Sequence, residues 1–320
     1  MKNLSITTDG LDTDTPMPGD AVSEAGPVAG KKHQSVNRRI VRLAWSYTEM
    51  KVAFTLFALL ALLAVFAPWA MGIDPTKMDV ANKFLPPVFM DGGQWTHMLG
   101  TDQLGRDLLI RSLVGMRNAF ALSIVSVVGM FVMGCIIGIC SGYFGGWVDA
   151  VFMRITDVQM SLPVIILAIT ILGMSRPTPA LIIIVLILSG WPVYARISRS
   201  VTLAERQKEY VRAAQILGAS NLRIMARHIA PSILPPIAFV AVLDIARMMI
   251  FEAIFSFIGI GIQPPTPTFG TIIASGTQYL LNAWWITIVP GILLALALIS
   301  LNLMGGIFER SRNRILQGAD

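Results

Sequence analysis

Residues 119–143 read AFALSIVSVVGMFVMGCIIGICSGY, a run of 25 residues without a charged side chain. About 20 consecutive apolar residues in a helix are enough to cross the hydrocarbon core of a bilayer, so this stretch predicts a membrane-spanning helix. Gly134, Gly138 and Gly142 follow at intervals of four residues within it and share one helix face. Because small residues at this spacing let two helix backbones approach closely, we expect this face to pack on another helix.

Composition extends this prediction to most of the chain. Of 320 residues, 54% are hydrophobic and only 14% are charged, whereas a soluble domain carries about 25% charged residues. The apolar residues gather in long blocks, which indicates lipid as the solvent. The sequence therefore predicts an all-α membrane protein with about six transmembrane helices. Besides 119–143, the predicted spans are 52–69, 152–174 (with Pro163 inside it), 180–195, 234–259 and 285–306.

The positive charges predict the orientation. The net charge is +6, but Lys and Arg lie between the apolar blocks, which argues against a nucleic-acid-binding protein. The segments predicted inside the cell (1–51, 144–154, 196–233 and 307–320) hold 18 Lys and Arg residues, and the outer links hold 6, with Arg247 left out. Both termini are therefore expected in the cytoplasm. Residues 1–45 have the polar composition of a disordered tail, and the first span resembles a retained signal-anchor.

Three charged residues, Asp244, Arg247 and Glu252, fall inside the predicted span 234–259. Charges at membrane depth are costly and usually face a partner or a water-filled path. Asp244 and Arg247 are three residues apart and are placed to pair on a helix. Two interpretations stay open: a structural ion pair with Glu252 near an interface, or a face that lines a pore or contacts another subunit.

Motifs for catalysis are missing from the sequence. It contains no GxxxxGK[ST] phosphate-binding loop and no GxSxG or HExxH motif. His33, His97 and His228 lie in three separate links of the predicted topology, so they cannot meet around a metal ion or a nucleophile. We therefore expect neither enzyme activity nor a cofactor or metal site in this chain. A transporter of this kind needs an ion gradient or an ATP-hydrolysing partner.

The predicted cytoplasmic loop 196–236 is too long for a simple helix connection and too apolar for a disordered one. Its apolar residues recur at helical spacing at Leu203, Tyr210, Ala214 and Leu217. Gly218 should break this helix, and Ser220 or Asn221 should cap a second one over 222–228. Pro231, Pro235 and Pro236 are expected to close the unit. We predict a helix–turn–helix on the membrane face; an amphipathic interfacial linker is the simpler alternative.

Within this loop, Glu209-Tyr-Val-Arg-Ala-Ala-x-x-x-Gly218, ending at His228-Ile-Ala-Pro231, resembles the EAA signature of permease subunits from binding-protein-dependent ABC importers. Leu99–Asp107 (LGTDQLGRD) and Phe255–Pro265 (FSFIGIGIQPP) are similar to two further segments of the dipeptide, oligopeptide and nickel branch, in its C-type permease. Ala230 and Ser232 depart from the family pattern, which has Leu and Asn there.

The resemblance implies a type I ABC importer transmembrane domain in the bacterial inner membrane. The expected organisation is a tail over 1–45, the first transmembrane helix and the start of a periplasmic link over 46–97, a permease domain over 98–310, and a cytoplasmic C-terminus over 311–320. The implied partners are a second permease, two ATPase subunits that hold ATP and Mg²⁺, and a periplasmic solute-binding protein. The implied cargo is a peptide or a related small solute.

The resemblance also implies a docking site for the ATPase in the loop. It would consist of Glu209, Tyr210, Ala213, Ala214, Gly218, Ala219, Arg227, His228 and Pro231. Glu209 would offer a carboxylate to a basic partner residue, and Gly218 would allow the sharp turn. Two other functions remain as alternatives: a secondary transporter driven by an ion gradient, and a structural membrane scaffold.

Overall fold

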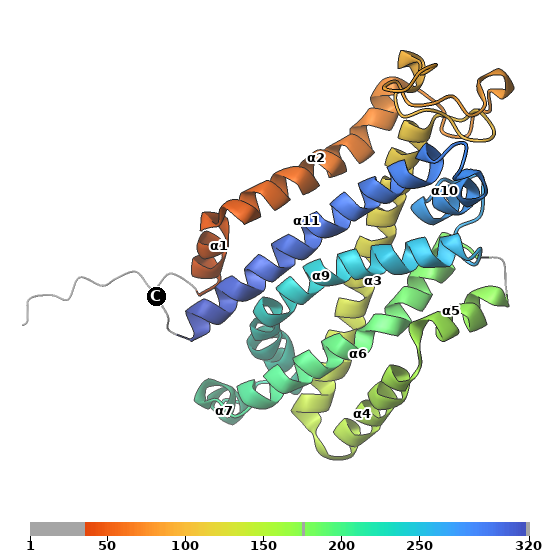
Figure 1. Ribbon diagram of the computed structural model, residues 1–320. Coiled ribbons are helices and arrows are strands. Elements are labelled where there is room, and N and C mark those ends of the chain that lie inside the picture. Colours follow the sequence, from red (N-terminus) through yellow and green to blue (C-terminus); the bar gives the residue numbers. More distant parts are fainter. Residues whose placement is uncertain (1–35, 175–176, 318–320) are drawn as a thin grey trace, which may run out of the picture. The chain divides into compact units, whose positions relative to one another are not determined.

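The computed structural model describes residues 36–174 and 177–317. The regular elements there are helices, with a single isolated bridge between Thr101 and Asp107, so the predicted all-α class is confirmed (Figure 1). The helices are α1 (Val36–Ser46), α2 (Thr48–Met71), α3 (Leu108–Phe144), α4 (Gly146–Ser161), α5 (Val164–Gly173), α6 (Pro179–Glu205), α7 (Glu209–Ile216), α8 (Asn221–Ile224), α9 (Ala230–Phe257), α10 (Phe269–Gly276) and α11 (Trp285–Leu316). The predicted disordered tail lies outside the described residues up to position 35, but its last part is helical in α1; residues 318–320 also lie outside them.

Four described helices, α2, α3, α6 and α11, are long and apolar enough to cross a membrane. They correspond to four predicted spans, and all four are longer than predicted. Helix α3 begins at Leu108, where the Asp107 side chain accepts from the Ile110 amide at 2.9 Å, and α6 continues to Glu205. Helix α9 has 28 residues and is long enough to span, but it carries three charged residues and is not among these four. The count of six spans stays a prediction.

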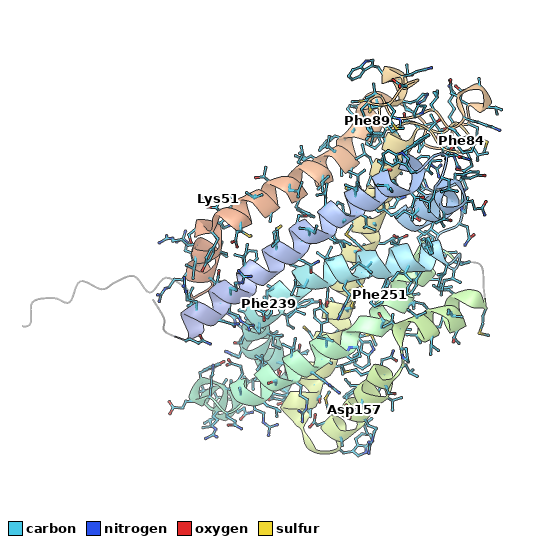
Figure 2. All side chains as sticks on the ribbon, viewed as in Figure 1. Lys51, Phe84, Phe89, Asp157, Phe239 and Phe251 are labelled. Carbon is cyan, nitrogen blue, oxygen red and sulfur yellow. The ribbon has the colours of Figure 1, made fainter. Side chains whose placement is uncertain are left out.

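The predicted span 152–174 is broken rather than continuous. Helix α4 ends at Ser161, α5 begins at Val164, and the two are bent by 87°. Pro163 between them lacks the amide hydrogen that a continuous helix requires and clashes with the preceding turn. Asp149 and Asp157 tie α4 to α6 through ion pairs with Arg199 at 2.5 Å and Arg196 at 2.6 Å. Figure 2 labels Asp157 on α4.

The glycine face of α3 packs on α6, as the spacing predicted. A Cβ atom on Gly134 would lie 2.7 Å from the Trp191 carbonyl oxygen, and one on Gly142 would lie 2.8 Å from the Thr202 Cβ. A Cβ on Gly138, between them, would collide with the backbone of α6. The two helices approach so closely because these positions carry no side chain.

Residues 72–107 form an ordered segment at the opposite end of the molecule from α7. Asp102 is buried and accepts from the Arg106 Nε at 2.7 Å, while the Nε of buried Arg111 lies 3.5 Å away. Trp285 at the start of α11 donates from its indole nitrogen to the Thr101 carbonyl at 3.2 Å. The LGTDQLGRD motif therefore joins this segment to α3 and α11. Leu108 and residues 110–116, at the start of α3, are buried.

Helix α9 lies among α3, α6 and α11 and contacts all three (Figure 1). Met248 and Phe255 pack in the core shared with α3 and α6. Ala246 and Met249 pack in a second core with α2, α3 and α11. The segment that contains α7 and α8 is thus attached to the helix at the centre of the packing.

Candidate functional site

Helices α7 and α8 form a hairpin between α6 and α9. Residues 206–208 alone separate α6 from α7, and α8 continues through a π-helical turn, Met225–Ile229, into α9. Gly218 has φ +77 and makes the predicted turn, and the Ser220 hydroxyl accepts from the Arg223 amide at 3.4 Å, so the predicted cap is confirmed. The predicted proline closure is wrong. Pro231 lies in the first turn of α9, where a missing amide hydrogen is tolerated, and the chain continues helically.

Apolar packing holds the hairpin against the rest of the subunit. Val211 of α7 is fully buried in one cluster with Ile224 and Ile229. Ala214 and Ala219 pack against that cluster, and the Ala219 amide donates to the Ala214 carbonyl at 3.0 Å. The loop is therefore a folded unit, as predicted, and not a linker lying loosely on the membrane.

Glu205, the last residue of α6, holds α7 by its carboxylate. It is only 8% exposed and accepts from the Lys208 ammonium at 2.6 Å and from the Tyr210 hydroxyl. The hydrogen bond to Glu205 raises the pKa of Lys208, and partial burial, followed by the same carboxylate, raises the pKa of Tyr210. The sequence does not signal this anchor, because a lone Glu at a helix end carries no distinguishing pattern.

The C-terminal end of α3 holds the hairpin by hydrogen bonds. The Arg206 guanidinium donates to the Gly142 carbonyl at 2.9 Å, and the Tyr143 hydroxyl donates to the Asn221 side-chain oxygen at 2.9 Å. Gln215 of α7 donates to the Tyr143 hydroxyl at 3.5 Å. These contacts join residues more than 60 positions apart, so nothing in the local sequence signals them.

The predicted docking residues divide into two groups. Most face away from the core: Glu209, Tyr210, Ala213, Gly218, Arg227 and Pro231 are exposed, whereas Ala214, Ala219 and His228 are partly buried. The structure brings Tyr210 and His228 together, with ring centroids 6.2 Å apart. Most of the predicted docking residues are therefore accessible to a partner.

The tip of the hairpin exposes large apolar side chains. Ile216, Leu217 and Leu222 are 85%, 86% and 73% exposed and flank the Gly218 turn; we call these three residues the apolar tip. Leu217 follows Tyr210 and Ala214 at helical spacing in the sequence, but α7 ends at Ile216 and the chain has already begun to turn. A contiguous exposed apolar surface rimmed by polar residues is typical of a protein-binding site.

The three charged residues of α9 differ in how far they are buried. Asp244 and Glu252 are buried within the subunit, and the Ser256 hydroxyl donates to Glu252 at 2.8 Å. Arg247 pairs with Asp244 at 2.7 Å, as predicted, but its side chain is 44% exposed. Arg247 alone of the three therefore reaches the surface of the subunit.

The chain is similar to known transport proteins along most of its length. The family model described as binding-protein-dependent transport system inner membrane component matches residues 130–314. The di/tripeptide transport system permease protein DppC of Pseudomonas aeruginosa is 34% identical over 247 residues, which cover 77% of this chain and 82% of that protein. The probable D,D-dipeptide transport system permease protein DdpC of Escherichia coli is 33% identical, and the match covers 82% of this chain and 88% of that protein. The nickel transport system permease protein NikC of Escherichia coli is 34% identical, and the match covers 82% of this chain and 91% of that protein. With a family model that spans more than half of it and relatives that match most of it, the chain belongs to the family of binding-protein-dependent transport system inner membrane components.

Proposed function

We propose that the α7–α8 hairpin docks this permease subunit on an ATP-hydrolysing partner. Membership of the family makes the chain a multi-pass inner-membrane permease of an ABC importer, which works with ATPase and binding-protein partners. The observation that carries the proposal is the apolar tip, held out by a hairpin whose Val211 is fully buried. Side chains such as Leu217 would lose contact with water in a partner's groove, which stabilises the complex by about 1.5–3 kcal/mol for each side chain fully buried.

The end of the molecule that carries α7 is the cytoplasmic end in this proposal. The count of 18 Lys and Arg residues in the inner segments against 6 in the outer links supports that orientation. The 72–107 segment and α10 then face the periplasm, where a solute-binding protein would deliver its cargo. The permease domain would extend over 98–310, with the hairpin as its coupling element. Glu209, Ala213 and Arg227 would contact the ATPase beside the tip.

A second permease subunit would cover the face of α9 that carries Arg247. This residue lies roughly midway between Ala230 and Phe257, so it is near the centre of the membrane in a spanning helix. A guanidinium facing lipid there costs at least about 2.5–3.5 kcal/mol. An exposed Arg247 is therefore better explained by a partner subunit or a water-filled path. The partner would be a different chain or a second copy of this one.

The cargo we propose is a peptide or a related small solute. The relatives' names refer to di- and tripeptides, D,D-dipeptides and nickel, and these names support a solute of that range for this chain. The family also supports ATP-driven import over the ion-gradient mechanism considered from the sequence. Neither the fold nor the relatives support the gradient-driven alternative.

The test reconstitutes the permease pair, the ATPase and the binding protein in vesicles. Replacing Ile216 and Leu217 together by serine should abolish co-purification of the ATPase and ATP-driven uptake while leaving membrane insertion intact. Leu281→Ser is the matched control, because Leu281 is 99% exposed at the opposite end of the molecule. Normal uptake by the double variant would refute docking through the tip. Uptake that persists without the ATPase would instead favour the ion-gradient mechanism.

A further inference from the structure

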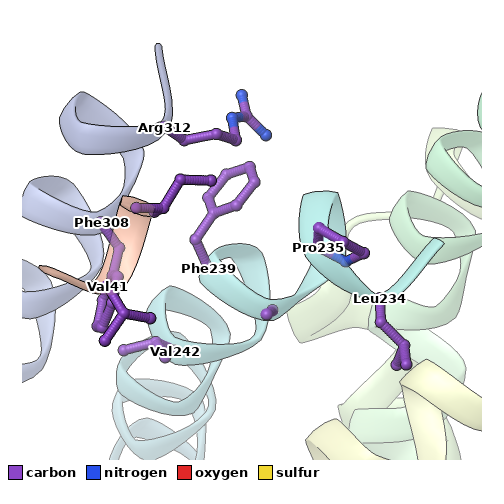
Figure 3. A pocket seen from close by; sticks show the side chains of 9 residues that line it. Val41, Leu234, Pro235, Phe239, Val242, Phe308 and Arg312 are labelled. Atoms are coloured by element: carbon purple, nitrogen blue, oxygen red, sulfur yellow. The ribbon is translucent and has the colours of Figure 1, made fainter. Parts of the chain in front are cut away.

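A groove separate from the hairpin lies between α1, α9 and α11 (Figure 3). Its volume is about 380 Å³, within the range of about 300–1,000 Å³ that is usual for small-molecule sites. The walls are almost entirely apolar. The residues that matter are Val41, Leu234, Ala238, Phe239 and Phe308, with Arg312 at the rim.

Arg312 gives the rim of the groove a positive charge. Its guanidinium lies 4.1 Å from the centroid of the Phe239 ring and donates to the Asn313 side-chain oxygen at 3.2 and 3.3 Å. Both partners are uncharged, so they orient the guanidinium without neutralising it. Figure 3 shows the Arg312 side chain extended over Phe239. The site thus combines a fixed cation with a narrow apolar cavity.

Helix α1 places the groove at the level of lipid headgroups. Arg38 and Arg42 are exposed on it, whereas Ala44 is fully buried. Trp45 packs edge-on against Phe54 of α2, with ring centroids 5.0 Å apart. A short amphipathic helix with Arg on one face and Trp near its end is typical of the membrane interface.

We propose that the groove binds an anionic phospholipid of the leaflet on the α7 side, with an acyl chain in the apolar cavity and the phosphate on Arg312. An arginine fork matches phosphate oxygens in geometry and charge. Basic pockets between transmembrane helices on the cytoplasmic side favour acidic lipid headgroups. Exposed Arg38 and Arg42 nearby would repel the ammonium group of a zwitterionic lipid, so charge complementarity selects the anionic one.

The size of the groove argues against a protein occupant. A transmembrane helix has a diameter of about 10–12 Å with its side chains, and a 380 Å³ cavity holds only a thin, flexible group. A partner helix would also have to bring a carboxylate to Arg312. A lipid, by contrast, already carries its phosphate at the depth of Arg312 in the membrane.

The experiment measures lipid binding to the purified full-length permease complex by native mass spectrometry, with phosphatidylglycerol and phosphatidylcholine of identical acyl chains. The wild-type complex should retain phosphatidylglycerol in preference. Arg312→Gln should weaken phosphatidylglycerol binding about tenfold, as expected for one lost charge-assisted contact. Arg314→Gln is the matched control, because Arg314 is two residues further along α11 and donates to the Tyr47 hydroxyl at 3.2 Å.

A second variant tests the acyl-chain half of the site. Ala238→Leu places a larger side chain in the cavity and should weaken binding of both lipids, because their acyl chains are identical. Equal binding of the two lipids by the wild type, or equal effects of Arg312→Gln and Arg314→Gln, would overturn the proposal. Disulfide capture of the second permease by Val41→Cys would also overturn it, since a protein would then occupy the groove.

Discussion

Glu205 and Tyr210 offer the sharpest test of how the hairpin is held. In a double-variant cycle, Glu205→Gln and Tyr210→Phe are made singly and together. The Tyr210 hydroxyl donates to a carboxylate that is 8% exposed, while Tyr210 itself is 43% exposed. A hydrogen bond to a charged group contributes about 1.5–3 kcal/mol. Because Tyr210 is partly solvated, we expect about 1–2 kcal/mol here.

The two single variants should each loosen α7 by about that amount, and the double variant should cost little more than either. The ion pair between Glu205 and Lys208 should add only about 0–1 kcal/mol, because the Lys208 side chain is 53% exposed. Hydrogen exchange of the amides of residues 209–216 measures this local opening directly. A change of 1–2 kcal/mol corresponds to exchange roughly 5- to 30-fold faster.

The same variants separate docking from coupling. Neither substitution touches the apolar tip, so the ATPase should still bind and hydrolyse ATP. Uptake should fall, because a loosened α7 no longer transmits its movement to α6. We therefore expect more ATP hydrolysed for each solute imported. Unchanged exchange in both single variants, or strictly additive effects in the double variant, would refute the role of this pair as the anchor.

Three further predictions concern the packing and charge of the scaffold. Gly138→Ala should destabilise the protein by about 1–3 kcal/mol in thermal unfolding, whereas Gly291→Ala, with nothing within 4 Å of the added Cβ, should not. Asp102→Ala should cost about 3–5 kcal/mol and expose the 72–107 segment to protease, because it leaves two buried arginines without their shared carboxylate. Since the pKa values of Lys208 and Tyr210 are raised when α7 is folded, their contribution to its stability is complete below about pH 10 and is lost as the pH rises above it. Anisotropy of a dye on the hairpin, followed from pH 7 to 11, measures this loss, and Tyr210→Phe should reduce it.

The positions of the long helices could be predicted from hydrophobicity, but their ends could not. Helix α6 runs ten residues beyond the predicted span, since Arg196 and Arg199 are paired with carboxylates of α4 and do not end the helix. Helix α3 starts early for a similar reason, because Asp102 holds Arg111 in the interior. A charged residue marks the end of a membrane span only where water solvates it. Where the residue forms a tertiary ion pair instead, its charge no longer indicates where the helix ends.

The folded hairpin could be predicted from the sequence to within a few residues, but its surface could not. Glu209 and Gly218 bound α7 and its turn as the motif implied. The helical spacing that includes Leu217 extends past Ile216, the last residue of α7, so it does not predict how exposed Leu217 is. Glu205 was missed because its role depends on Tyr210 folding back against it, a contact that belongs to the tertiary structure.

The connections of the hairpin explain how docking would reach the membrane. Residues 206–208 are too few to form a flexible linker between α6 and α7, and α8 passes into α9 without a break. A displacement of the apolar tip is therefore transmitted to two long helices rather than absorbed in a loop. Helix α6 is tied to α3 by the close glycine packing, so the pair should move together. Helix α9 carries Arg247 on its exposed face, and a tilt at its start would shift that guanidinium relative to a second subunit. The hairpin thus joins the proposed ATPase-docking site to the face of α9 proposed to contact a second subunit, which is the geometry that a rigid-body switch requires.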